Sequence, residues 1–520
     1  MDPKGGSSDL TLPQTQETGV EDSSGAEPCI ETTPSHATKL LENDGIIFSR
    51  RKKSGALYKQ LLKDQHYLRN SLLAGVGYLE LANAGDFAAN VWNNIPVPMF
   101  AVALMAVGGT IALSISLFAF RDAVLSWRNI RNLRAERRYL HSLAVDTVDI
   151  PDRSLDQDHH SRTTTRLVSK IPRDIDAQLK VNSRELGTEL IDRIGMDITM
   201  GFGAVAVGVG TFLAIGGANP QVFRASNLLS GYIGNAPVSF FGAVNAGWSA
   251  YVWQRARRHG RAGTRELNIN DNVNYNYVDN NHSNETNTDL DANKDALQAV
   301  KAALKSRLRT VKVHAVVSSV TGITAGAASL VTATMWYGYP VLVLCIISSI
   351  LTNCIWRYKI GYDRPLVRHR VRLSKDSLIQ DLELVTTARR ILDEARLEKL
   401  ELMPLLPKFV SDAGSLAAVV EFLAKNDLLE DFYTRLLTST ALSEALFGSP
   451  SNNNDNEELV IEPLTLLGAD EVYVPQCLEI AEATIQDKVA IRLKYRERYL
   501  LEALGCYLCS VSDEALVEKC

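Results

Sequence analysis

The sequence predicts an all-α, multi-pass helical membrane protein that carries a helical C-terminal module. Three observations lead to this class. Long segments without a charged residue occur in the middle of the chain, arginines and lysines follow them, and the last third repeats apolar residues at three- and four-residue steps. A helix rises about 1.5 Å per residue, so about 20 apolar residues cross a hydrocarbon core of about 30 Å.

The clearest apolar segment is 95–120, which contains no charged residue. Arg121 follows it at once, and further arginines continue as far as Arg138. Positive residues collect on the cytosolic side of membrane helices. This pattern therefore predicts a crossing that ends in the cytosol and continues as a basic helix.

Four further apolar segments follow the same plan, at 198–218, 228–253, 313–336 and 341–356. They form two pairs. Each pair is joined by a short turn with a proline and is closed by basic residues. Short turns between apolar helices are typical of helical hairpins. We therefore expect the basic ends, and both termini of the chain, in the cytosol.

The segment 72–91 allows two interpretations. Its length, glycines and alanines suit a crossing that packs closely on its neighbours. It also carries Glu80 and Asp86, and carboxylates inside a membrane are costly unless they are paired or face a polar interior. An amphipathic surface helix is the other interpretation, but it would require a basic N-terminal tail to be translocated. We favour the crossing, which gives six crossings; without it there are five.

The other regions are polar. A tail rich in Ser, Thr, Gly and Pro is expected to be disordered, and so is an Asn-rich tract. In the C-terminal module, Ser374 to Ser377 offer a helix N-cap, and helices are expected at 416–425, 428–447 and 476–508. The predicted organisation is a tail (1–50), a basic helix with the first hairpin and its exit helix (51–138), a cytosolic loop (139–196), a second hairpin (197–261), an Asn-rich loop (262–300), a third hairpin (301–373) and a cytosolic helical module (374–520).

Two carboxylates, Glu80 and Asp86, are the candidate site residues, because they alone fall within an expected span. One interpretation is an ion or proton site that faces the interior of the bundle; the other is the polar face of a helix packed on a neighbour. Hydroxyl and amide side chains could line a polar path, or equally form hydrogen bonds between helices. They are at positions 235, 245, 318, 319, 321, 324 and 332.

Other motifs do not predict a metal or cofactor. The loop residues Asp156 to His160 have no spacing that fixes a coordination geometry. Sequons at Asn281 and Asn284 fall in a loop expected in the cytosol. Cys506 and Cys509 form a single CxxC without the second pair that a zinc site needs.

Function is bounded mainly by exclusion. Every basic cluster lies beside an apolar segment, so nucleic acid is not an expected partner, and no familiar catalytic motif is present. The lipid bilayer is the expected partner, together with proteins bound through residues 374–520. The first hypothesis is a membrane-anchored interaction or scaffold protein. The alternative is a transporter or channel that uses Glu80 and Asp86 in a polar interior.

Overall fold

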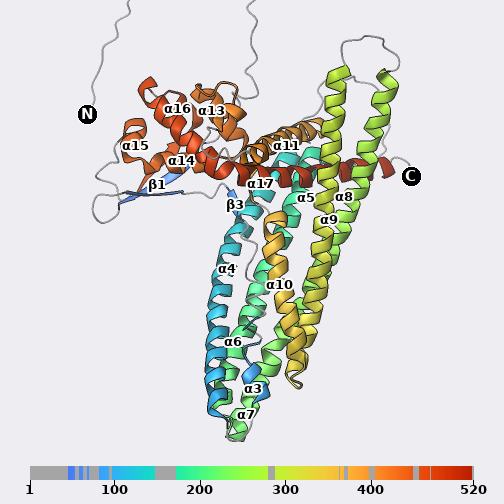
Figure 1. Ribbon diagram of the computed structural model, residues 1–520, viewed down its shortest axis with the longest axis vertical. Coiled ribbons are helices and arrows are strands. Elements are labelled where there is room, and N and C mark those ends of the chain that lie inside the picture. Colours follow the sequence, from blue (N-terminus) through green and yellow to red (C-terminus); the bar gives the residue numbers. More distant parts are fainter. Residues whose placement is uncertain are drawn as a thin grey trace, which may run out of the picture.

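Long helices stand side by side along the long axis of the computed structural model, and a body of shorter helices lies across one end of them (Figure 1). Helices make up 86% of the structure, which confirms the all-α class apart from a few short strands. The described residues are 45–52, 58–62, 67–69, 81–82, 84–92, 97–146, 171–278, 287–361, 363–367, 373–397, 405–448, 456–468 and 470–517.

Within the described residues, four helices are long and apolar enough to cross a membrane. They are α4 (Met99–Asp146), the continuous run α5 (Arg173–Thr188), η1 (Glu189–Gly195) and α6 (Met196–Ile215), α9 (Asn287–Thr332), and α10 (Gly338–Ile360). Each contains most or all of one of the expected apolar segments. A helix satisfies its own backbone hydrogen bonds and leaves apolar side chains free to face lipid. Leu117 and Phe118 of α4, which are 71% and 68% exposed, have the exposure expected of such side chains.

The fifth expected segment, 228–253, is helical and belongs to the bundle, but it is not among these four. It starts in the π-helix η2 (Asn227–Ile233) and continues in α8 (Asn235–Val278), which packs along α9. Polar residues such as Asn245 and Ser249 lower its mean hydropathy. A short helix, α7 (Pro220–Ser226), precedes η2, and the side chain of Asn219 caps it by accepting from the backbone N–H of Gln221 at 3.0 Å.

The sixth expected segment, 72–91, is described only in part. Residues 81–82 and 84–92 form a turn and the short helix α3 (Phe87–Val91), which packs on α4. Residues 72–80, including Glu80, lie outside the described residues. Four candidate crossings are therefore established by length and apolar composition, whereas six stay a prediction.

The long helices continue well beyond their apolar segments. The basic exit helix expected up to Arg138 is confirmed, since α4 runs without a break to Asp146. The Asn-rich tract differs from expectation. Its described parts are helical, because α8 continues to Val278 and α9 begins at Asn287. The two helices pack on each other along their length, so tertiary contact extends helices that composition alone would end.

A small antiparallel sheet replaces the basic helix that we expected from residue 51. Its strand order is β2 (Tyr58–Leu62), β1 (Ile46–Lys52) and β5 (Asn456–Ile461). Ile46 and Phe48 of β1 are buried, and Ile46 lies opposite the buried Ile461 of β5. The pairing joins segments some four hundred positions apart, so local periodicity does not reveal it.

The C-terminal module contains the largest apolar core of the described residues. Its helices are α11 (Lys375–Leu397), α12 (Leu406–Phe409), α13 (Leu416–Lys425), α14 (Leu429–Thr438), α15 (Thr440–Phe447), α16 (Pro463–Leu467), the 3₁₀ turn η3 (Glu471–Tyr473) and α17 (Val474–Val517). The expected cap is confirmed, since Ser374 and Ser377 exchange hydrogen bonds of 2.9 and 3.0 Å between backbone N–H and side-chain oxygen.

The helix α17 attaches this module to the bundle. It runs across the ends of the long helices (Figure 1) and packs on α5 and α8 as well as on α11 and α14. A second pair of strands, β3 (Tyr67–Arg69) and β4 (Asp363–Pro365), lies beside it. The module is therefore an integral part of the helix bundle in this structure.

Candidate functional site

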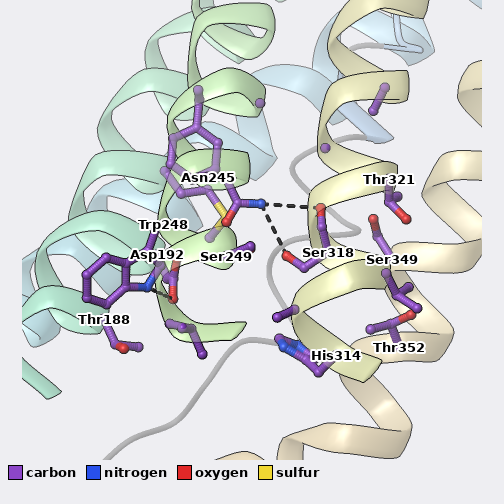
Figure 2. A pocket seen from close by; sticks show the side chains of 18 of the residues that line it. Thr188, Asp192, Asn245, Trp248, Ser249, His314, Ser318, Thr321, Ser349 and Thr352 are labelled. Atoms are coloured by element: carbon purple, nitrogen blue, oxygen red, sulfur yellow. Dashed lines mark hydrogen bonds between the residues drawn. The ribbon is translucent and has the colours of Figure 1, made fainter. Parts of the chain in front are cut away.

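A cavity of about 110 Å³ with both polar and apolar walls lies inside the bundle, between α5, η1 and α6 on one side and α8, α9 and α10 on the other. Besides Arg184, its polar lining is Thr188, Asp192, Asn245, Trp248, Ser249, His314, Ser318, Thr321, Ser349 and Thr352 (Figure 2). Pockets for drug-sized ligands measure about 300 Å³ or more, whereas one water needs about 10 to 15 Å³ of such space. The cavity therefore suits several waters or a small ion.

Asp192 is the carboxylate of the cavity. Trp248 of α8 donates its indole N–H to Asp192 Oδ2 at 2.9 Å (Figure 2). Among the described residues, the other oxygen, Oδ1, is buried and has no hydrogen-bond partner. Buried carboxylate oxygens are normally hydrogen-bonded or bound to a cation. Asp192 thus lines the cavity and keeps one acceptor oxygen for which the described residues supply no donor.

Asn245 and Ser318 cross the cavity between α8 and α9. Asn245 Nδ2 donates to Ser318 Oγ at 3.2 Å, and its oxygen is left for another donor or for a cation (Figure 2). Of the polar residues proposed to line a path, Asn245, Ser318 and Thr321 do line the cavity. Asn235 and Thr332 instead approach each other at 3.5 Å between η2–α8 and α9. The interpretation as hydrogen bonds between helices therefore holds for both pairs, whereas a polar path stays a prediction.

Two basic side chains also line the cavity, Arg184 and His314. The guanidinium of Arg184 is engaged by Glu502 at 3.4 Å. The ring of His314 packs edge to face on Trp356, with centroids 5.9 Å apart. Within the described part of the chain, neither of them donates a hydrogen bond to Asp192, so the carboxylate is not neutralised by a direct ion pair.

The π-helix η1 directs charged side chains to two sides. Asp192 faces α8 and the cavity, whereas Glu189 and Arg193 face α4. A π-turn widens the helix by one residue and is frequent at functional sites. Ser126 and Asn129 of α4 donate to Glu189, the latter at 3.0 Å, and Arg193 binds Glu189 at 3.1 Å. Arg193 also reaches Asp122 at 2.9 Å.

The predicted site residues lie elsewhere. Glu80 is outside the described residues. Asp86 is buried beside α3 and does not line the cavity. Tyr339 donates its hydroxyl to Asp86 at 2.8 Å, and Asn90 donates its amide N–H at 3.0 Å. These bonds connect the turn before α3 to α10, so Asp86 has the partners that Asp192 lacks.

Sequence reasoning missed Asp192 because it placed the residue in a cytosolic loop. A signal was available, since Glu189, Asp192, Arg193 and Asp197 are clustered directly before an apolar segment. Charged residues at that edge are usually solvated. Only the packing of η1 against α4 and α8 brings them inside the protein.

A second polar cluster surrounds Glu502 of α17. Three arginines reach its carboxylate, each from a different helix of the bundle: Arg184 of α5 at 3.4 Å, Arg255 of α8 at 3.3 Å and Arg307 of α9 at 3.6 Å. Burial on its own would raise the pKa of Glu502, but the arginines outweigh it and hold the pKa well below its usual range. We call these four residues the Glu502 cluster.

Arg364 of β4 forms a comparable buried cluster. It binds Glu136 of α4 and Glu185 of α5, each at 2.6 Å, and Tyr499 of α17 lies against its guanidinium. Burial would lower the pKa of Arg364, but the two carboxylates raise it well above its usual value. Together with the Glu502 cluster, it connects α17 to α4, α5, α8 and α9.

His259, Glu502 and Cys506 come within 4.8 Å of one another through their donor atoms. That set resembles a metal-binding arrangement, but three arginines already share Glu502 and Arg255 donates to Cys506 Sγ at 3.0 Å. Burial raises the pKa of the Cys506 thiol to about 12, so the thiol stays protonated. A cation there would meet resident positive charge, and these residues serve better as a structural contact.

The remaining sequence motifs give no further site. Asp156 to His160 and the sequons at Asn281 and Asn284 lie outside the described residues. Comparison of the chain with protein-family models, curated proteins and solved structures finds no match.

Proposed function

We propose that the protein is an integral membrane protein that takes a small cation, or a small solute with a cationic group, into the cavity of its helix bundle, as a transporter or channel does. The observation that carries this proposal is Asp192, a half-buried carboxylate that lines the cavity and has one buried oxygen without a hydrogen-bond partner among the described residues. A carboxylate inside an apolar bundle is costly unless a cation, proton or donor accompanies it.

The other cavity walls support the same choice of ligand. Asn245, Ser318 and Thr321 add amide and hydroxyl oxygens beside Asp192. Oxygen ligands of this kind suit hard cations. Arg184, the nearby permanent cation, is held by Glu502. The proposal keeps the transport alternative drawn from the sequence, but it moves the essential carboxylate from Glu80 and Asp86 to Asp192.

The test is cation flux into liposomes that contain the purified full-length protein, with K⁺, Na⁺ and guanidinium as probes. Asp192→Asn should reduce flux of the accepted cation at least tenfold, because it removes the charge and keeps the shape. Asp86→Asn is the matched control, since it neutralises a buried carboxylate outside the cavity. Thermal unfolding of each variant checks that it is folded. Equal flux in the wild type and Asp192→Asn, or no flux of any probe, would refute the proposal.

A second candidate is the membrane-anchored interaction protein first expected from the sequence. It is favoured by apolar side chains exposed on consecutive elements of the module: Val460 on β5, Leu464 on α16 and Val472 on η3, the last 76% exposed. Such residues often mark contact surfaces when they are contiguous. Proximity labelling from the C-terminus should identify neighbours that the double variant Leu464→Glu and Val472→Glu loses. An unchanged set of neighbours would exclude this surface.

We also propose that residues 374–520 face the cytosol, because the helix ends beside them are rich in arginine. An epitope fused to the C-terminus should then be reached by antibody only after the membrane is permeabilised. Detection of that epitope on intact cells, before the membrane is permeabilised, would show that residues 374–520 face away from the cytosol and would contradict this proposal.

A further inference from the structure

Two carboxylates lie together on the side of η1 that faces away from the cavity. Asp197, just after η1, is fully buried, and neither of its carboxylate oxygens has a hydrogen-bond partner among the described residues. It is in direct electrostatic contact with Asp122 of α4. Asp122 receives Arg193 on Oδ1 at 2.9 Å, but its Oδ2 is also buried and without a partner. Three buried acceptor oxygens, two of Asp197 and one of Asp122, therefore have no hydrogen-bond donor among the described residues. Arg193, which binds Asp122, is one helical turn before Asp197.

The surrounding charges do not resolve this. Arg193 is the cation of the group, and it is already divided between Asp122 and Glu189. Glu189 has its own donors, Ser126 and Asn129 of α4. The α8 side chains packed beside this part of the bundle, Val238 and Phe241, are apolar. Fully ionised, the cluster would hold three negative charges and one positive charge in a buried site.

A proton resolves both problems at once. Two carboxylates in contact cannot both stay ionised without large repulsion, and a single proton between them removes one charge and supplies the missing hydrogen-bond donor. A neutral carboxyl then donates to its neighbour, and Arg193 balances one remaining charge. The two oxygens of Asp197 and Oδ2 of Asp122, which lack partners among the described residues, are the acceptors between which this proton can be shared.

We propose that Asp122 and Asp197 bind one shared proton at neutral pH, as a proton site distinct from the cavity at Asp192. The site goes beyond the proposed cation binding, because it exists whether or not the cavity takes up a solute. Its position has a mechanistic consequence. Arg193 and Asp192 are adjacent on η1, so release of the proton would change the charge on the same helical turn that carries the cavity carboxylate.

The experiment is infrared spectroscopy of the full-length protein in detergent micelles, titrated from acid to alkaline pH. The wild type should show the carbonyl absorption of a buried protonated carboxyl at neutral pH, and this band should be lost in Asp197→Asn. Asp122→Asn should remove or shift it. Asp176→Asn is the control, because Asp176 already has Lys180 at 2.8 Å and Ser510 at 2.6 Å as donors and should contribute no such band.

Stability gives an independent measure. An amide at position 197 supplies the donor that the proton supplied, so Asp197→Asn should unfold at least as high as the wild type at alkaline pH. The wild type alone should lose stability as pH rises through the titration, because the folded state then loses a proton that the unfolded state does not hold. No band at neutral pH, or a sodium- or calcium-dependent rise in unfolding temperature that Asp197→Asn abolishes, would overturn the shared proton. Neither result depends on cation flux, so it leaves the cavity proposal separate.

Discussion

The Glu502 cluster and the cavity at Asp192 each contain a carboxylate inside the protein and share the helices α5, α8 and α9, yet they differ in how far their charges are satisfied. Glu502 has three arginines within 3.6 Å. Asp192 has one indole N–H at 2.9 Å and a free oxygen. In the first arrangement the carboxylate is fully paired with arginines, and these ion pairs hold α17 on α5, α8 and α9. The second leaves a charge that something outside the chain can complete.

The comparison teaches where to look for function when no match to a known protein guides the choice. Buried charges with complete sets of partners are structural, and their loss should lower stability. Buried charges with incomplete sets are available for a ligand or proton, and their loss should lower binding with little effect on stability. The following predictions test the structural side of this contrast, since the cavity variants above test the other.

The largest effect is expected from Glu502→Gln. This variant leaves three buried arginines without their shared carboxylate, and removing one partner of a buried ion pair typically costs about 3 to 5 kcal/mol. The unfolding midpoint should fall strongly, and the protease sensitivity of residues 374–520 should rise as α17 loosens. By contrast, Asp192→Asn should leave the unfolding midpoint nearly unchanged. If Glu502→Gln is as stable as the wild type, the cluster does not attach the module.

Acidification should weaken the same contact. Burial lowers the pKa of His259 to about 4, with Glu502 opposing and Arg255 adding to the shift. The unfolded chain takes up a proton near pH 6.5, but the folded chain does not until about pH 4, so stability should fall as pH decreases through that window. The loss should reach about 2 kcal/mol between pH 7 and pH 5. Thermal unfolding at the two pH values measures it.

His259→Gln provides the control for that pH dependence. Its side chain does not titrate, so the difference in unfolding midpoint between pH 7 and pH 5 should shrink. An undiminished difference would assign the pH dependence to other groups. Glu502 affects stability at lower pH than His259 does. Because its pKa in the folded state is depressed, its contribution to stability is present above the pKa of an ordinary glutamate and is lost only as the pH falls below that value.

A smaller effect is expected from Gly505→Ala, which tests the close approach of α17 and α8. A Cβ at position 505 would lie 2.7 Å from His259 Nδ1 and 3.1 Å from His259 Cγ. Overpacking of this kind costs about 1 to 3 kcal/mol, of which alanine returns about 1 kcal/mol through its helix propensity. We expect a modest fall in the unfolding midpoint.

Gly260→Ala is the matched variant on α8. Its new Cβ would meet Leu308 Cδ1 at 3.5 Å, an ordinary contact, so the helix propensity should dominate and the midpoint should rise slightly. The change in unfolding midpoint would then have opposite signs for the two glycine-to-alanine substitutions. If both substitutions stabilise, the helices are not as close at Gly505 as the structure places them.

The smallest effect is expected from Asp487→Asn. Asp487 binds Arg435 at 3.1 Å, but the two side chains are 48% and 38% exposed. Exposed ion pairs contribute about 0 to 1 kcal/mol and are screened by salt. The free energy of unfolding of this variant should stay within about 1 kcal/mol of the wild-type value. The difference between the two should disappear at high salt. A loss as large as that of Glu502→Gln would mean that burial does not separate the two pairs.

Much of the architecture followed from local pattern. The apolar segments in α4, α6, α9 and α10, the continuation of α4 through its arginines, the cap at Ser374 and the helix at 416–425 were all expected. These features depend on residues within a few turns of one another. Periodicity and capping chemistry report such features directly.

The long-range features did not follow. Arg255 and Arg307 had the expected look of basic flanks beside a membrane segment, whereas the structure directs both to Glu502 on α17. The strand Ile46–Lys52 was expected as tail and basic helix, but it pairs with Asn456–Ile461. In each case the partner lies hundreds of residues away, and nothing near either residue marks the pairing.

The sequence by itself determined which segments are apolar enough for lipid, which residues can cap a helix, and which flanks are basic, because each of these is a property of neighbouring residues. Only the tertiary structure decided which charged groups have a full set of hydrogen-bond and ion-pair partners and which do not. Whether a carboxylate has partners depends on the side chains that other helices bring to it, as three arginines do for Glu502 and a single indole does for Asp192.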